Sequence, residues 1–313
     1  MFMMTNYKDF LSSNNVEILV VSLCLFAGII VGNVHVLVAF WQNRGLRNQG
    51  RCHIVSLAVA DLLVGLLLLP IRTYQLYYLQ NPFHAIFCVF YMWIDTLCET
   101  ASIVSLTVIS IDRCYKITFP LQYKAKVTPR KCFVVILGVW FFSTTFATLG
   151  VIPYNGNNNI HPGLIKCFNP NYLFYLFAFI FAFVLPCVIL TSTYVLIFIT
   201  AYRRRRRLAQ SNGIFCSAGG RSMYVKDLKN AKTLAIFVLA FIICWGPIFL
   251  AFGSTDVANV ICKNVIFCFL TKDVLPFANS LCNPIIYALC NREFRQAVQK
   301  TYTKFFRRCK NCF

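Results

Sequence analysis

CVFYMWIDTLCETASIVSLTVISIDRCY, residues 88–115, is an apolar segment with polar side chains at three depths. Twenty-five residue steps separate Cys88 from Arg113, which in an α-helix is about 38 Å at roughly 1.5 Å per residue. That length slightly exceeds the ~30 Å hydrocarbon thickness of a bilayer. We therefore predict one membrane-spanning helix with an end at each surface.

The strongly polar groups of this segment, except Asp112, gather on one face of the predicted helix. At about 100° per residue, Asp95, Glu99, Ser102 and Arg113 fall within roughly 40° of one line. A carboxylate in a membrane helix costs a few kcal/mol, so it is expected to face a cavity or a partner. Asp95 and Glu99 are therefore candidate site residues. The alternative for Asp95 is a simple ion pair with a neighbouring cation such as Arg72.

The composition of the whole chain excludes an ordinary soluble domain, because 58% of its 313 residues are hydrophobic and only 13% are charged. Further apolar stretches of helix length lie at residues 16–41, 53–78, 133–152, 172–202, 231–252 and 261–290. We predict an all-α fold, a seven-transmembrane helix bundle over residues 16–290. An extracellular tail without a cleavable signal peptide is expected at 1–15, and a short amphipathic cytoplasmic eighth helix at 291–313.

The positive charges predict the orientation. The net charge is +20, and all but five of the 30 Lys and Arg lie in or beside one set of alternate loops. The exceptions are Lys8, Arg72, Lys166, Lys263 and Lys272. Because positive loops stay inside, the amino terminus is expected outside the plasma membrane and the carboxyl terminus in the cytoplasm. The basic charge therefore indicates anionic membrane lipid, and no nucleic acid, as a partner.

The 16 cysteines show no zinc-ligand spacing, and most sit singly in apolar runs, where Cys behaves as a small hydrophobe. Cys88 and Cys167 are both predicted on the outer side. A disulfide between them would attach the Asn-, Gly- and Pro-rich loop after the fourth span to the third helix. Cys309 and Cys312, beyond the amphipathic helix, are candidate palmitoylation sites.

Motifs in all seven spans follow one another in a characteristic order. They are Gly32-Asn33, LAVAD ending at Asp61, Cys88, Asp112-Arg113, Trp140, Pro186 with Tyr194, CWGP at 244–247 and NPIIY at 283–287. With them, residues 20–300 resemble the rhodopsin-like (class A) G-protein-coupled receptors, and within these the biogenic amine and trace amine receptors. IVSLAVADLLVGLLLLP, ISIDRCYKITFPLQYKAK and Asp95, seven residues after Cys88, carry the amine resemblance.

The resemblance implies that Asp95 is the counter-ion of a protonated amine, because burying an unpaired charge is expensive. We expect a compact amine or diamine, with Glu99 and Asp273 as second contacts, since two neighbouring carboxylates disfavour simultaneous ionisation. The alternative for Glu99 is a protonated acid hydrogen-bonded inside the bundle. Further expected contacts are Thr96, Phe179, Trp245, Phe249, Phe252 and Phe277. These aromatics could hold a cation face-on, and ordinary core packing is their alternative.

Several positions depart from the pattern of amine receptors. Ala178, Phe179 and Ala182 stand where catecholamine receptors place hydroxyls, so a catecholamine is not expected. Val274 and Phe277 replace the Trp and Tyr usual in the seventh span. Phe277 also stands where visual pigments carry the retinal-binding lysine, so retinal is excluded. The alternative function is a class A receptor for a non-amine small molecule or peptide.

A second polar group is expected deep in the bundle. It consists of Asp61, Asn33, Ser102, Asn279 and Asn283. In the family such a cluster holds a sodium ion, and an all-oxygen shell suits a hard cation. A water-filled hydrogen-bond network is the alternative. No other cofactor is expected.

The resemblance also implies that the cytoplasmic end couples to a heterotrimeric G protein when the sixth helix moves outward about Pro247. Asp112 and Asp227 are expected to hold Arg113 in a latch, and Leu121 to enter the G protein. The alternative is that Asp227 is a solvent-exposed acid in the first turn of the sixth helix and takes no part in the latch. The other implied switch positions are Tyr194, Asn283, Pro284 and Tyr287.

The sequence argues against two other classes of protein. A transporter would use intramembrane acids as an ion path, but neither paired half-chains nor matching broken helices are found. An enzyme is not expected, since the four His are scattered and the chain shows no Ser/His/Asp set or metal-ligand cluster.

Overall fold

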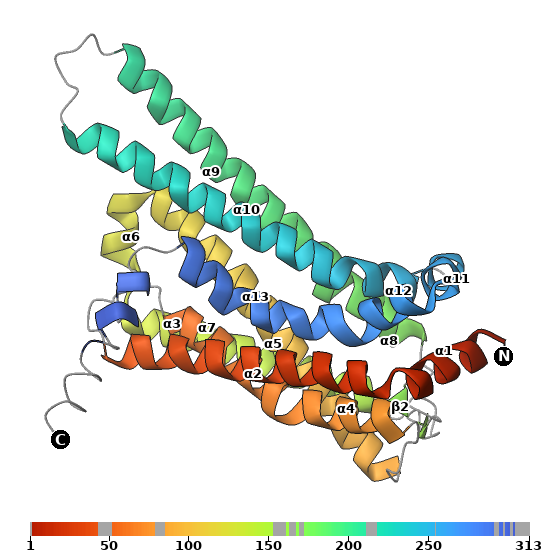
Figure 1. The fold of residues 1–313 in the computed structure, drawn as a ribbon. Helices are drawn as coiled ribbons and strands as arrows, with labels where there is room; N and C mark the ends of the chain where they lie inside the picture. The colour runs from red at the N-terminus through yellow and green to blue at the C-terminus, as the bar shows by residue number, and fades with distance from the viewer. Residues whose placement is uncertain are drawn as a thin grey trace, which may run out of the picture.

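The structure is a computed structural model that describes residues 2–42, 52–78, 85–152, 161–162, 167–168, 172–210, 218–253, 255–290, 294–296, 298–300 and 303. Long helices run side by side in one bundle (Figure 1). The strands within these ranges are β1 (His161–Pro162) and β2 (Cys167–Phe168), which pair antiparallel. The predicted all-α bundle is confirmed.

Six helical runs among the described residues are long and apolar enough to cross a membrane. They are α2 (Asn15–Gln42); α3 (Cys52–Leu63) with η2 (Val64–Leu68) and α4 (Leu69–Tyr78); α5 (Ala85–Thr118); α7 (Pro129–Val151); α8 (Tyr172–Ala178) with η3 (Phe179–Val184) and α9 (Leu185–Gln210); and α12 (Val265–Phe269) with η4 (Leu270–Val274) and α13 (Leu275–Cys290). A seventh apolar stretch, Ala235–Ala251, lies within α10 (Ala218–Gly253). These seven elements match the predicted spans.

Each π-helical segment ends two residues before a proline. Pro70 follows η2, Pro186 follows η3 and Pro276 follows η4. Proline lacks an N–H and its ring clashes with the carbonyl four residues earlier, so the hydrogen-bond ladder widens by one residue there. Each wider turn changes the direction in which the neighbouring side chains point. In the seventh span, Asp273 lies within such a turn, η4.

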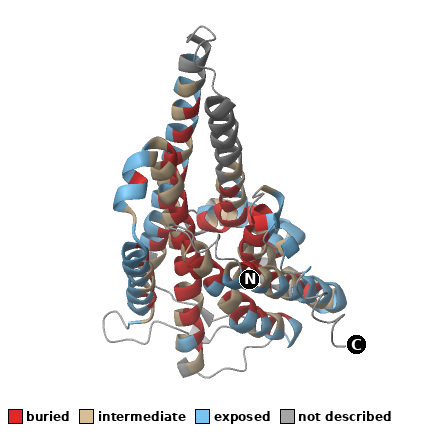
Figure 2. Cartoon of the chain, turned by 90° about the vertical axis from the view of Figure 1, so that its left-hand side faces the viewer, coloured by how far each residue is buried: buried red, intermediate tan, exposed pale blue. Residues whose placement is uncertain are grey.

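Helix α5 is the central helix of the bundle. It packs against α3, α7 and α9, and 67% of its membrane-spanning window is buried, more than in any other described span. Buried residues gather on the faces that the helices turn toward one another (Figure 2). The polar face predicted for residues 88–115 is therefore enclosed by neighbouring helices.

Small residues allow α2 to approach its neighbours closely. A Cβ atom on Gly32 would lie 2.7 Å from Cγ of Pro284, and one on Gly65 would lie 2.8 Å from Cγ2 of Ile29. Both distances are too short for real contacts, so glycine is required where α2 meets α13 and η2.

The ends of the bundle contain helices that the sequence analysis did not anticipate. Helix α1 (Phe2–Ser13) occupies the expected tail, and its Leu11 is fully buried. Helix α6 (Pro120–Lys126) occupies the loop before the fourth span. Figure 1 places α1, α11 and α12 at one end of the bundle, and α6 with the far ends of α9 and α10 at the other.

The seventh span begins later than predicted. Helix α11 (Thr255–Lys263) contains Ile261, and a new helix starts at Val265. The side chain of Asn264 accepts a hydrogen bond from the backbone N–H of Phe267 at 3.1 Å, which caps α12. This cap separates two helices that had been predicted as one span.

Candidate functional site

The acids predicted to bind the ligand lie around one buried tyrosine. Asp95 and Glu99 are half-buried on successive turns of α5. Tyr91, one turn before Asp95, is 1% exposed. It lies close enough to Asp95, Glu99 and Asp273 to interact electrostatically with each of them. The structure thus brings the three predicted acids together at the end of the bundle that carries α1.

Asp273 is the acid whose partners are best defined. Nε of Arg72 donates to its Oδ1 at 2.6 Å, and the same guanidinium completes an ion pair through Nη2. The hydroxyl of Tyr7, on α1, donates to the other carboxylate oxygen. Arg72 and Asp273 are each 4% exposed. Arg72 therefore forms an ion pair with Asp273, on the seventh span.

Two further buried polar groups come from the helices that carry this ion pair, Gln75 from α4 and Thr271 from η4. Nη1 of Arg72 donates to Oε1 of Gln75 at 3.3 Å. Nε2 of Gln75 and the hydroxyl of Thr271 are buried without a hydrogen-bond partner in the described part of the chain. An unsatisfied buried group costs about 1–3 kcal/mol, so a water or a ligand atom that reached these groups would be stabilised.

The predicted aromatic residues divide between two clusters. Trp245 and Phe249 lie 5.7 Å apart between ring centroids, and Phe183 stacks on Phe249 at 5.2 Å. Phe179 extends this group, 6.0 Å from Phe183. Phe277 packs instead with the cluster around Tyr91 on α5. The ring of Phe183, one turn after Phe179 and missed in the sequence, links η3 to α10.

The inner polar cluster forms around Asp61, which is 0% exposed. Ser102 donates to its Oδ1 at 3.0 Å, and Asn283 donates from Nδ2 to its Oδ2 at 2.8 Å. Ser280, absent from the predicted set, also hydrogen-bonds to Asp61. Asn33 donates to the backbone oxygen of Ser280 at 3.1 Å. The remaining predicted member, Asn279, is buried on the same helix as Asn283.

The arrangement around Asp61 joins helices that are far apart in the sequence. It connects the second, third and seventh spans through one carboxylate, and the first span reaches it through the backbone of α13. The oxygens of one carboxylate and two hydroxyls form a donor set of the kind that hard cations prefer.

At the opposite end, Asp112 is held by a residue that the sequence analysis missed. Tyr123 of α6 is buried and donates its hydroxyl to Oδ1 of Asp112 at 2.8 Å. Nε of Arg113 lies 4.0 Å from Oδ2 of the same carboxylate, too far for a hydrogen bond. Burial and the nearby carboxylate raise the pKa of Tyr123, so the phenol remains a donor.

The other predicted switch residues lie around this end of the bundle. Tyr287 is buried and packs on Phe237, 5.3 Å away between centroids, and on Phe294, at 6.1 Å. Tyr194 is half-buried, and Leu121 is 82% exposed on α6. Pro247 and Pro284 lie inside α10 and α13.

Comparison with known proteins identifies the architecture. A family model described as 7 transmembrane receptor (rhodopsin family) matches residues 32–287. The chain belongs to this rhodopsin family of receptors. The match confirms the prediction of a class A receptor, and with it a multi-pass membrane protein.

Named relatives of the receptor are similar over most of its length. It is 36% identical over 297 residues to the histamine H2 receptor of Rattus norvegicus, and 34% identical over 297 residues to that of Cavia porcellus. Each match covers 92% of this chain and 79% of the relative. The 5-hydroxytryptamine receptor 1B of Mus musculus is 29% identical over 321 residues, which cover 86% of this chain and 82% of the relative.

Disulfides shape the end of the receptor that carries α1. Cys88 is disulfide-bonded, and β2, which contains Cys167, packs against α5. The side chain of Cys167 lies outside the described residues, so the pairing of these two cysteines stays a prediction. Cys262 and Cys268 form a second disulfide, with Cα atoms 4.5 Å apart. It bridges the turn at Asn264, whereas the sequence analysis treated both cysteines as single apolar residues.

Four other predictions for the receptor fall outside the described side chains. They concern Asp227, Phe252, Cys309 and Cys312. The latch to Asp227, the ligand contact of Phe252 and both palmitoylation sites therefore stay predictions. The described residues beyond α13, at 294–296, 298–300 and 303, are helical and include the buried Phe294, in agreement with the predicted eighth helix.

Proposed function

We propose that this receptor binds a small protonated amine at Asp95 and transmits binding to a heterotrimeric G protein. The observation that carries the proposal is the pairing of Asp273 with Arg72. Asp95, Glu99 and Asp273 place three acids near Tyr91, and Arg72 is the cation that acts on the same residue. A site with more acids than cations attracts a protonated amine. The relatives support the same ligand class, since histamine and 5-hydroxytryptamine are both amines.

The orientation that we propose places α1 outside the cell and α6 in the cytoplasm. It is supported by the arginines at the end of α9, among them Arg203, Arg204 and Arg206, since positive residues stay on the cytoplasmic side. Arg204 also donates to the backbone oxygen of Ile117 at 2.6 Å, which holds this end of α9 against α5.

On the ligand side, Asp95 would pair with the ammonium group and Glu99 would bind a second amine or donate a hydrogen bond as a neutral acid. Trp245 and Phe249 would cover the apolar part of the ligand, because aromatic faces attract cations. Thr96 would add a polar contact from the same helix. In this proposal Asp273 acts indirectly, by neutralising the charge of Arg72.

On the cytoplasmic side, the G protein would bind Arg113 after the sixth span moves outward about Pro247. Ligand contributes to this movement only through its different affinity for the two bundle arrangements. Leu121 is available as an apolar contact for the G protein, given its exposure on α6. Tyr194 and Tyr287 would close around Arg113 in the active arrangement.

We also propose a sodium ion beside Asp61 in the inactive arrangement. The oxygens of Asp61, Ser102 and Ser280 fit such an ion chemically, and Asn279 and Asn283 would complete its surroundings. The ion would compete with the hydrogen bonds that now link the carboxylate to its neighbours. The ion would therefore favour the inactive arrangement of the helices over the active one.

The function can be tested with a panel of amines and diamines on membranes that contain the receptor and an added G protein. Nucleotide exchange by the unmodified chain is compared with exchange by Asp95→Asn. Losing the partner of a buried charge costs about 3–5 kcal/mol, so agonist potency should fall by roughly two to three and a half decades. Glu99→Gln serves as the matched control, with a smaller expected loss for amines that carry one charge.

An unchanged potency in Asp95→Asn, at equal surface expression, would rule out the ammonium role. Absence of nucleotide exchange with every ligand and every G protein tried would contradict coupling itself. Exchange driven by a non-amine ligand and insensitive to Asp95→Asn would favour the alternative receptor class.

A further inference from the structure

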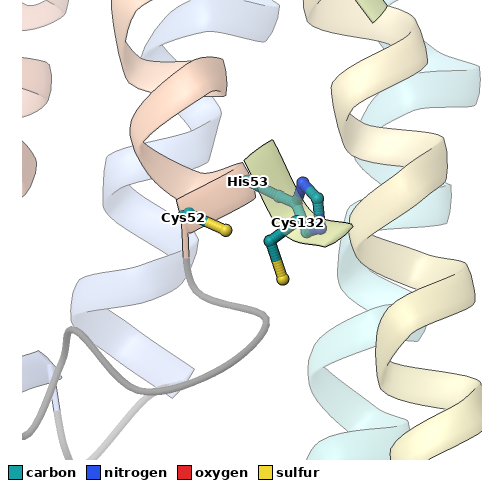
Figure 3. Close-up of side chains that lie close together, drawn as sticks. All are labelled: Cys52, His53 and Cys132. Atoms are coloured by element: carbon teal, nitrogen blue, oxygen red, sulfur yellow. The ribbon is translucent and has the colours of Figure 1, made fainter. Parts of the chain in front are cut away.

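Three metal-binding side chains meet at the end of the bundle that carries α6. Among the described residues, Cys52, His53 and Cys132 form the one group of three or more such side chains whose ligand atoms lie within 4.8 Å of one another. Figure 3 shows the three side chains gathered in the space between their helices. None of them belongs to the ligand, sodium or coupling sites described above.

The backbone holds these residues in place from two helices. Cys52 and His53 are the first two residues of α3, and Cys132 lies in the first turn of α7. Thr128 caps α7 by accepting a hydrogen bond from the backbone N–H of Lys131, and Cys132 donates its own N–H to the backbone oxygen of Thr128 at 3.1 Å. All three side chains therefore come from α-helices, and the helix that carries Cys132 has a capped start.

The surroundings suit a bound metal ion. His53 is 5% exposed and Cys132 is 3% exposed, while Cys52 is half-buried. The thiols of Cys52 and Cys132 are close enough to hydrogen-bond to each other. A metal ion would replace this weak contact by two bonds to sulfur.

The ligand set and spacing fit zinc. Zinc binds thiolate sulfur at about 2.3 Å and imidazole nitrogen at about 2.0–2.1 Å in tetrahedral geometry. Ligand atoms in such a site are therefore separated by roughly 3.6–3.8 Å. The separations of at most 4.8 Å here need to shorten by at most about 1.2 Å, which side-chain rotation can supply.

We propose that Cys52, His53 and Cys132 form a zinc-binding site that joins the cytoplasmic ends of the second and fourth spans. A water molecule would fill the fourth coordination position. Binding releases one proton from each thiol, so two thiols and Zn²⁺ give a neutral zinc–dithiolate unit and two protons. The imidazole of His53 coordinates in its neutral form.

The compartment favours zinc over a disulfide. Under the orientation proposed above, this end faces the cytosol, where thiols are kept reduced. Cysteine pairs there more often bind metals than form lasting disulfides. The proposal rests on that orientation and on the contacts of the cluster, and it does not depend on the identity of the ligand.

The position of the site connects it to receptor output. Asp112 and Arg113 lie close enough to His53 to interact with it electrostatically. A zinc ion would keep His53 uncharged and would fix the start of α3 beside the carboxylate that Tyr123 holds. We therefore expect zinc to restrict movement around Asp112 and Arg113.

The first test measures metal binding by the full-length receptor, purified in detergent with a non-thiol reductant. Zn²⁺ affinity is compared among the unmodified chain, Cys52→Ser, His53→Asn, Cys132→Ser and the control Cys24→Ser, which removes an exposed thiol of α2. Replacing a residue that only hydrogen-bonds to a metal ligand already weakens metal binding 10- to 100-fold. Each ligand variant should therefore bind zinc at least about 100-fold more weakly, and the control should bind unchanged.

Co²⁺ gives an independent readout on the same proteins. Its thiolate charge-transfer absorption should appear in the unmodified chain and in Cys24→Ser, and should disappear in Cys52→Ser. Equal zinc affinity or equal cobalt absorption in all five proteins would overturn the proposal.

A second test needs no variant, so it stands even where a substitution prevents folding. Zinc should slow alkylation of Cys52 by a maleimide in the unmodified receptor, as followed by peptide mass spectrometry. It should leave unchanged the rate at Cys290, a free, half-buried thiol at the end of α13. Equal rates with and without zinc would refute the site. Recovery of a Cys52–Cys132 disulfide from cells whose thiols were blocked before lysis would refute it as well.

Discussion

Replacing Asp273 by asparagine should destabilise the receptor by breaking a buried ion pair. Asp273→Asn would leave the guanidinium of Arg72, 4% exposed, without its charged partner, and would weaken the hydrogen bond from Tyr7. Removing one member of a buried pair costs about 3–5 kcal/mol. At about 2 °C per kcal/mol for a chain of this size, the unfolding temperature should fall by about 6–10 °C.

The companion variant removes both charges. Arg72→Met together with Asp273→Asn leaves no buried unpaired ion, and such replacements are often neutral. The double variant should therefore recover most of the lost unfolding temperature. Asp9→Asn, which changes an exposed acid of α1, is the control and should leave the unfolding temperature unchanged.

The assay is thermal unfolding of the purified receptor, alongside agonist potency in nucleotide exchange. It compares the unmodified chain, Arg72→Met, Asp273→Asn and the double variant, which form a double-mutant cycle. The coupling between the two substitutions then isolates the ion pair. The structural role of the ion pair would be refuted if Asp273→Asn were as stable as the unmodified chain. It would also be refuted if the double variant were no more stable than Asp273→Asn. A loss of potency without a loss of stability would show instead that Asp273 contacts the ligand.

Three further substitutions test other parts of the receptor. Asp61→Asn removes the charge that a sodium ion needs, so added NaCl should no longer lower agonist affinity in a binding assay; persistent sodium sensitivity would argue against the ion. Tyr123→Phe removes a hydrogen bond to a carboxylate, with a cost of about 1.5–3 kcal/mol, and should speed backbone hydrogen exchange in α6. Cys262→Ser opens a disulfide whose cysteines are six residues apart, which should lower stability by about 2 kcal/mol; a reductant should then lower the variant's unfolding temperature less than that of the unmodified chain.

The sequence predicted the bundle because apolar length and charge asymmetry depend little on tertiary detail. Seven stretches long enough to span a bilayer define seven helices, and the polar line on residues 88–115 marks the helix that neighbours enclose. The break at Asn264 was missed because apolar residues lie on both sides of it. The signal in the sequence that could have revealed the break was Asn264 itself, because an asparagine side chain can cap the start of a helix.

The partners of the site residues were harder to predict. Arg72 and Asp273 are 201 positions apart, so their pairing is set by how the second and seventh spans pack. Tyr123 was overlooked for the same reason, because the helix that carries it was predicted as a loop. Cys52 and Cys132 have no zinc-like spacing in the sequence, and only the side-by-side placement of two helix starts brings them together.

The amino-terminal helix has a practical consequence for experiments. Leu11 of α1 is fully buried, and Tyr7 reaches Asp273. A purification tag or fluorescent protein fused directly ahead of α1 would press on these anchoring contacts and change the stability being measured. Affinity handles for biophysical work on this receptor therefore belong at the opposite terminus, or behind a long flexible spacer.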